Sequence, residues 1–146
     1  MIEIRCISIE DPLYPAEREL RFRVLRQPLG FEQGAESFDF EDQSVHVVAV
    51  EDEQVVGCVL FFPDGKGSGR LFQMAVASHL QGHGLGRDLV RYLESELVKQ
   101  GVSEVRMHAR EQAVGFYERL GYACFGEPFT EIGVPHRNMR RELLQD

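Results

Sequence analysis

A glycine-rich loop between an apolar run and an amphipathic stretch constrains the fold more than any other feature. The loop, residues 81–87 (QGHGLGR), follows the apolar run 71–76 and leads into residues 85–98, where leucines recur every four positions. Glycines allow the chain to turn tightly and to approach a ligand closely. The first N–H groups of the following helix lack partners within the helix, and its dipole favours an anion. The sequence therefore predicts a strand, an anion-binding loop and a helix.

The rest of the chain alternates short strands and helices. Asp52-Glu53 predicts a tight hairpin turn between two β-branched runs, and glycines at 101 and 121 end the two later helices. Strands are expected at 1–8, 45–51, 54–62, 71–76, 104–109, 122–125 and 137–143, and helices at about 11–29, 85–98 and 112–120. This order, β-α-(α)-β-β-β-α-β-α-β-β, predicts a mixed α/β sheet in one domain, residues 1–146.

Residues 31–44 (FEQGAESFDFEDQS) carry five acidic side chains and show no strong periodicity. The stretch predicts a loop or a short irregular helix, and a mobile lid is one interpretation. It would favour a cationic substrate if it closed over a binding site, whereas a solvated loop would have no such role.

Charge and cysteine usage narrow the class of protein. The chain has 16 basic and 24 acidic side chains, a net charge of −8, which argues against nucleic acid as a partner. No apolar stretch approaches the length of a membrane-spanning helix, and the first residues lack the layout of a signal peptide. Cys6, Cys58 and Cys124 are odd in number and widely spaced, so no disulfide framework is expected. These features predict a cytoplasmic protein with no membrane partner.

Three phosphate-binding patterns can be compared with the loop. A Walker P-loop requires GxxxxGK[S/T], which the chain lacks, and a dinucleotide fingerprint requires a glycine where Arg87 stands. The third pattern, [Q/R]xxGxG/A, is matched by Gln81, Gly84 and Gly86. A glycine-rich turn that merely starts a helix remains the alternative for this segment taken alone.

A second motif lies about 30 residues downstream, where Ala113, Tyr117, Gly121 and Tyr122 form an AxxxYxxxG-aromatic run. Together the two segments resemble the GCN5-related N-acetyltransferase (GNAT) superfamily, whose element order the whole chain follows. The resemblance implies the GNAT fold, a mixed and mostly antiparallel central sheet of six to seven strands flanked by helices. It also implies acetyl-CoA as cosubstrate.

The resemblance assigns a binding role to each matching residue. The strand residues Met74, Ala75 and Val76 would pair with the pantetheine arm of acetyl-CoA, as a neighbouring strand would. The loop would hold the pyrophosphate through Gln81, Gly82, His83, Gly84, Leu85, Gly86 and Arg87. Tyr117 matches the tyrosine that protonates the departing thiolate, since a phenol is protonated at pH 7.

The segment before the last strand resembles a small-molecule branch of the superfamily that contains glyphosate N-acetyltransferase. In that branch the residue matching His136 is the general base, and those matching Arg26 and Arg110 hold the anionic end of the substrate. Phe72 stands where the branch has another arginine, and Arg70 lies nearby in a different register. Solvated surface charges are the alternative interpretation of Arg26 and Arg110.

The remaining histidines have simpler interpretations. His46 lies among valines on a strand, which fits a buried structural residue or a part of the substrate pocket. His79 and His83 are four residues apart but belong to the loop and have no third ligand nearby, so no metal site is expected.

The combined hypothesis is an acetyl-CoA-dependent N-acetyltransferase. It would act on the primary amine of a small molecule by direct attack in a ternary complex, with Tyr117 as acid and His136 as base. Two alternatives remain open: a protein or peptide acetyltransferase of the same fold, and a non-catalytic acyl-CoA-binding regulatory module. A monomer or a homodimer is expected.

Overall fold

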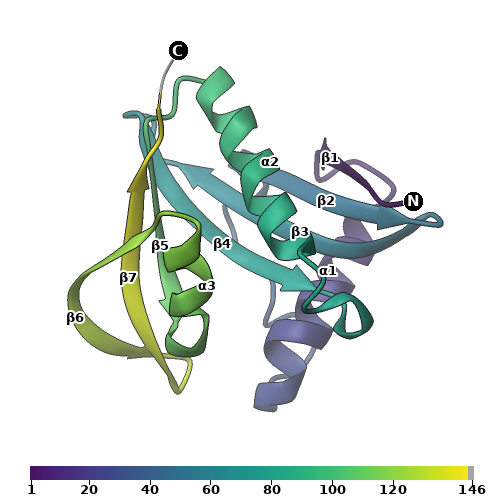
Figure 1. The fold of residues 1–146 in the computed structure, drawn as a ribbon. Helices are drawn as coiled ribbons and strands as arrows, with labels where there is room; N and C mark the ends of the chain where they lie inside the picture. Colours follow the sequence, from purple (N-terminus) through teal and green to yellow (C-terminus); the bar gives the residue numbers. More distant parts are fainter. Residues whose placement is uncertain (145–146) are drawn as a thin grey trace.

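The computed structural model describes residues 1–144 as a seven-stranded mixed sheet (Figure 1). Across the sheet the strands are β1 (Glu3–Ile7), β2 (Val45–Glu51), β3 (Gln54–Pro63), β4 (Ser68–Val76), β5 (Glu104–Arg110), β7 (Val134–Glu142) and β6 (Ala123–Glu131). Every neighbouring pair is antiparallel except β4 and β5, which run parallel. The predicted fold class, a mostly antiparallel sheet of six to seven strands flanked by helices, is confirmed.

Helices cover both faces of the sheet (Figure 1). On one face α2 (Leu85–Lys99) crosses β2, β3 and β4, and α3 (Val114–Arg119) follows a short 3-10 turn, η5 (Glu111–Ala113). On the other face α1 (Tyr14–Arg21) packs on β3 and β4. It continues into a π-helical turn, η1 (Phe22–Arg26), and a 3-10 turn, η2 (Gln27–Leu29). Among the residues that the structure describes, no helix has the length and apolar character needed to cross a membrane.

The stripe of leucines predicted from the sequence anchors α2 to the sheet. Leu85, Leu89, Leu93 and Leu97 are all buried. Gly57 on β3 lets the helix approach, because a Cβ there would lie 2.9 Å from Leu89 Cδ1 and 3.3 Å from Leu85 Cδ2. Close packing of this helix against the sheet fixes the position of its N-terminus, where the glycine loop ends.

The two parallel strands separate partway along their length. Ser68 to Leu71 pair with Glu104 to Met107, and the pairing ends at Leu71. The second half of β4 therefore has no strand partner on the β5 side, and a cavity opens between the two strands. An unpaired strand edge inside a protein presents N–H and C=O groups to whatever enters.

Element boundaries differ from the predictions mainly where long-range pairing extends a strand. β4 begins at Ser68, which pairs with Glu104, and β7 begins at Val134, three residues earlier than predicted. β6 is longer than the predicted 122–125 because it continues past an irregularity to Glu131. The predicted turn at Asp52-Glu53 is confirmed, with φ of 50° and 65°.

Candidate active site

A cavity of about 650 Å³ occupies the gap between β4 and β5. Its walls come from η1, α3 and the turn between β6 and β7 as well as from the two strands. The polar side chains that line it include Arg26, Arg70, Gln73, Gln81, His108, Arg110, Gln112, Tyr117, Glu131 and His136. A volume of this size is typical of a pocket for a small ligand.

A β-bulge shapes the β4 wall of the cavity. Leu60 pairs with Phe72 and Cys58 with Ala75, so Gln73 and Met74 both lie opposite Val59. Gln73 has φ of 52°, a conformation that few non-glycine residues adopt. Both Gln73 and Met74 line the cavity, at the unpaired edge of β4. No residue pattern in the sequence indicated this bulge.

The glycine loop brings the start of α2 to the same edge of the sheet. Gly84 is the N-cap residue with φ of 86°, and no side chain caps the helix. Gln81 donates a hydrogen bond from Nε2 to the carbonyl oxygen of Val76 at 3.0 Å, which ties the loop to the end of β4. Gly86 packs closely on β4 and α3, because a Cβ there would lie 3.2 Å from Met74 Cε and from Phe116 Cζ.

The structure thus brings the expected cofactor-binding residues together along one path. Met74, Ala75 and Val76 form the unpaired edge of β4, and the loop with the first turn of α2 follows directly. In the loop, Gln81, Gly82, His83 and Arg87 are exposed. The path suits an elongated molecule with a peptide-like part on the strand edge and an anionic part at the helix.

Tyr117 lies on α3 and faces the cavity. Its side chain is buried, with edge-to-face contacts to Phe116 and Tyr122 at centroid distances of 4.9 and 5.8 Å. Burial raises the pKa of Tyr117 well above its ordinary value, so the phenol is neutral at physiological pH. The neighbouring Tyr122 does not line the cavity, and its hydroxyl donates a hydrogen bond to Glu94 Oε2 at 2.8 Å.

His136 enters the cavity from β7, opposite Arg110 on β5. The side chain is 3% exposed and its ring stacks on Phe129. Its Nδ1 lies 2.7 Å from the carbonyl oxygen of Val134, a contact that requires Nδ1 to carry the hydrogen. In the neutral imidazole Nε2 is therefore the acceptor, the form needed to take a proton.

Arg26 and Arg110 meet beside His136, because Arg110 and His136 are paired positions on β5 and β7. Arg110 Nη2 donates to the carbonyl oxygen of Leu25 at 2.8 Å, and Arg26 Nη1 donates to the same oxygen at 3.4 Å. Burial lowers the pKa of both side chains, and the charge of Arg110 lowers that of Arg26 further. No carboxylate among residues 1–144 lies within ion-pair distance of either guanidinium, and the more distant charges of Glu131 and Glu36 oppose only in part the lowering of the Arg26 pKa.

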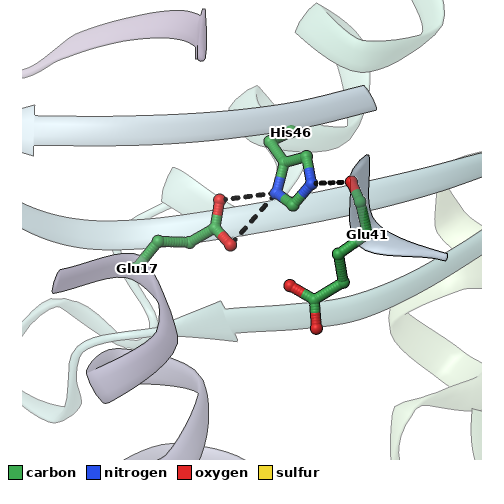
Figure 2. Close-up of side chains that lie close together, drawn as sticks. All are labelled: Glu17, Glu41 and His46. Atoms are coloured by element: carbon green, nitrogen blue, oxygen red, sulfur yellow. Dashed lines mark hydrogen bonds and ion pairs between the residues drawn. The ribbon is translucent and has the colours of Figure 1, made fainter. Parts of the chain in front are cut away.

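His46 does not reach the cavity, contrary to the expectation that it binds substrate. It lies on the α1 face of β2, where Nδ1 is 2.9 Å from Glu17 Oε1 and Nε2 is 2.7 Å from the carbonyl oxygen of Glu41 (Figure 2). The alternative interpretation, a buried structural histidine, agrees with these contacts. Glu17, Glu41 and His46 lie close enough to hold a metal ion, but Arg21 already donates hydrogen bonds to both carboxylates, at 2.9 and 2.8 Å.

The acidic stretch 31–44 also differs from its expected role over the site. Glu36 and Glu41 are buried and bind Arg18 and Arg21 of α1. Phe38 and Phe40 pack on Phe72, at centroid distances of 5.4 and 5.3 Å. The stretch is anchored to α1 and the sheet, and its two buried carboxylates are not available to a cationic substrate.

Three cavity residues were not predicted as site residues. Glu131 is the last residue of β6, His108 lies on β5, and Arg70 lies on β4 two residues before Phe72. Glu131 Oε1 is 2.9 Å from His108 Nδ1, and its Oε2 is 3.9 Å from Arg70 Nη2. Only the pairing of β6 with β7 brings Glu131 to the cavity, so local sequence patterns carried no signal for it.

Comparison with known proteins agrees with this geometry. A model of the acetyltransferase (GNAT) domain matches residues 22–143. YitI of Bacillus subtilis, an uncharacterized N-acetyltransferase, is 29% identical over an alignment that covers 99% of this chain and 98% of YitI. YjcF of the same organism, also an uncharacterized N-acetyltransferase, is 30% identical and covers 71% of this chain and 74% of its own.

Solved structures share the fold over nearly the whole chain. A Lactobacillus plantarum protein provisionally assigned as an N-acetyltransferase superposes with a TM-score of 0.87 at 25% identity, covering 98% of this chain and 99% of that one. An aminoglycoside 6′-N-acetyltransferase complexed with coenzyme A gives 0.81 at 18% identity, with 99% and 98% covered. The Escherichia coli ribosomal-protein-S18-alanine N-acetyltransferase gives 0.77 at 21%, with 100% and 96% covered. Because the last two proteins are only 18% and 21% identical to this chain, the similarity to them shows a shared fold alone.

Proposed function

The chain belongs to the GNAT acetyltransferase family, and on that premise we propose that it transfers the acetyl group of acetyl-CoA to the primary amine of a small molecule. The observation that carries the proposal is the shared cavity. It joins the unpaired edge of β4 and the loop before α2 to a neutral phenol, Tyr117, and an acceptor imidazole, His136.

The residues at the β4 edge and at α2 fit acetyl-CoA by their chemistry. The thioester supplies an activated acetyl group, and its carrier combines a chain with amide groups and a pyrophosphate. Backbone groups of Met74 to Val76 would pair with the amides, and the uncapped N–H groups of Leu85, Gly86 and Arg87 would receive the pyrophosphate.

Proton transfers in the proposed reaction belong to two side chains. His136 Nε2 takes a proton from the acceptor ammonium, which frees the nitrogen lone pair for attack on the thioester carbonyl. A C–N bond forms, the C–S bond breaks, and Tyr117 donates its hydroxyl proton to the departing thiolate. The nitrogen loses its second proton as the amide forms; that proton restores the Tyr117 hydroxyl, and His136 releases its own proton to solvent. Cys58 takes no part, because it is fully buried and burial raises the pKa of its thiol.

We assign the anionic end of the acceptor to Arg26 and Arg110. Their guanidinium groups converge on the Leu25 carbonyl and lack carboxylate partners among the described residues, which supports a role in binding a carboxylate or phosphonate. This assignment follows the resemblance to the small-molecule branch. The cavity volume of about 650 Å³ favours a small acceptor over a protein segment.

Acetyl-CoA binding is tested by the substitution Gly84→Glu. The new side chain adds a negative charge at the helix N-terminus and strains a backbone with φ of 86°, so affinity for acetyl-CoA is expected to fall at least about 10-fold. Gly101→Glu is the matched control: Gly101 has φ of 82° and open space around it, but lies at the other end of the same helix.

Isothermal titration of both variants with acetyl-CoA gives the result. Weak binding by Gly84→Glu and wild-type binding by Gly101→Glu support the proposed site. Equal binding by the two variants would remove the loop from the proposal.

A further inference from the structure

Glu131 is an acidic residue in a cavity whose other charged groups are basic. Among the described residues that line the cavity it is the only carboxylate, whereas Arg26, Arg70 and Arg110 are cations. Its side chain is 36% exposed and is part of the cavity lining. An ammonium group entering this cavity meets favourable charge at Glu131 alone.

One oxygen of Glu131 is held and the other is available. Oε1 lies 2.9 Å from His108 Nδ1, which fits a hydrogen bond donated by that imidazole. Oε2 accepts no hydrogen bond from residues 1–144, and its neighbours are Arg70 Nη2 at 3.9 Å and His136 Nε2 at 3.7 Å. His108 therefore orients the carboxylate so that Oε2 points toward the proposed base.

Two acceptor atoms then face each other across a short gap. Because His136 Nδ1 donates to the Val134 carbonyl, Nε2 of the neutral ring has a lone pair, as does Glu131 Oε2. Two acceptors 3.7 Å apart cannot bond each other, but one nitrogen with several hydrogens can donate to both. A primary ammonium is such a group.

The backbone supports this placement of Glu131. Ile132, the next residue, has φ of 49°, a region where β-branched side chains are rare, and it forms the β6–β7 turn with Gly133. Strained residues of this kind cluster at functional sites. The turn holds the end of β6 over the cavity, with Ile132 itself part of the lining.

We propose that Glu131 and His136 form the ammonium subsite of this cavity, in which Glu131 binds the acceptor's amine and delivers it to His136. The inference rests on the proposed acetyltransferase function and deepens it. Together with Arg26 and Arg110, which lie beside this subsite, Glu131 and His136 select a primary amine that also carries a carboxylate or phosphonate.

The test replaces Glu131 by glutamine, which keeps the shape of the side chain and removes its charge. Steady-state rates use the amino acid or aminophosphonate with the highest kcat/KM for the wild type. The KM for that amine is expected to rise about 10-fold to 100-fold in Glu131→Gln, with the KM for acetyl-CoA and the Tm unchanged. Glu127→Gln, an exposed position on the same strand, should match the wild type in all three. An unchanged amine KM, or an equal rise in both KM values, would overturn the proposal.

A binding experiment separates this inference from the proposed function. If the wild type binds acetyl-CoA but acetylates no amine, the proposed function fails, and Glu131 is still tested by titrating the CoA complex with aminomethylphosphonate. Weaker binding of aminomethylphosphonate by Glu131→Gln than by the wild type supports the ammonium subsite. Equal binding by the two proteins overturns it, and so does the absence of binding by the wild type. Methylphosphonate, which lacks the amine, should bind the variant at least as well as the wild type.

Discussion

At the scale of single residues, protonation states decide what the cavity can do. Tyr117 is buried against Phe116 and Tyr122, and burial raises the pKa of its hydroxyl. A phenol with a raised pKa stays neutral across the physiological range, so its proton is present when the thiolate departs. His136 donates a hydrogen bond from Nδ1 to the Val134 carbonyl, so the Nε2 of its neutral ring can accept a proton.

Removing the Tyr117 hydroxyl tests this division of roles. In Tyr117→Phe, kcat is expected to fall about 100-fold, because the thiolate would leave without a proton donor. The KM for acetyl-CoA should stay close to its wild-type value, since the ring and its packing are kept. Measuring kcat by thiol release and affinity by calorimetry separates the two effects. An unchanged kcat would remove Tyr117 from the mechanism.

Single residues also show where sequence reasoning succeeds and where it stops. The sequence motifs and the family resemblance predicted four site residues that line one cavity: Tyr117, Arg26, Arg110 and His136. Glu131 lies in a segment outside both predicted strands 122–125 and 137–143, so nothing local marked it. For His46 the sequence left both a structural and a substrate-binding interpretation open, because an alternating strand pattern tells which residues share a face but not what covers that face.

At the scale of elements, a buried charge network joins α1 to the sheet and to the acidic stretch 31–44. Arg21 bonds Glu17 and Glu41, and its Nε donates to Gln73 Oε1 at the β4 bulge at 3.3 Å. Burial alone would raise the pKa of the Glu41 carboxyl, but hydrogen bonds from Arg21 and Tyr14 lower it to about 2. Local patterns predicted α1 and the acidic stretch but could not show that the two form ion pairs with each other, since these contacts span 15 to 27 residues.

Breaking this network is expected to destabilise the protein. Arg21→Met leaves the Glu17 and Glu41 carboxylates buried without their shared partner, which should lower the free energy of unfolding by about 3–5 kcal/mol. Arg5→Met is the control, because its ion pair with Glu3 is largely exposed and should be worth less than about 1 kcal/mol. Urea unfolding at pH 7 measures both, and equal losses would contradict the role of the network.

Acid pH provides a second readout of the same variant. The folded-state pKa of Glu41 lies below its ordinary value of 4.5, so its contribution to stability is complete above that pH and is lost as pH falls toward about 2. Arg21→Met removes the main favourable contact. The part of the acid-induced decrease in the free energy of unfolding that comes from Glu41 should therefore disappear in Arg21→Met.

At the scale of the whole molecule, the separation of β4 from β5 organises everything else. The separation leaves one edge of β4 unpaired and free to bind acetyl-CoA, and the loop before α2 lies at the end of that edge. It also opens the cavity into which His136 enters from β7. The order of elements was predictable from periodicity and glycines. The bulge at Gln73 and the separation were not, because both arise from pairing between distant strands.

The central claim is that this cavity catalyses acetyl transfer to an amine, and thiol release measures it directly. Wild-type protein is incubated with acetyl-CoA and a panel of amino acids, aminophosphonates, polyamines and basic peptides, with His136→Ala as the comparison. The account predicts CoA release that requires a small amine with an anionic group, is matched by acetylated amine, and is strongly reduced in His136→Ala. Bound acetyl-CoA without amine-dependent release would contradict it and indicate a binding module, and release with peptides alone would indicate a protein acetyltransferase.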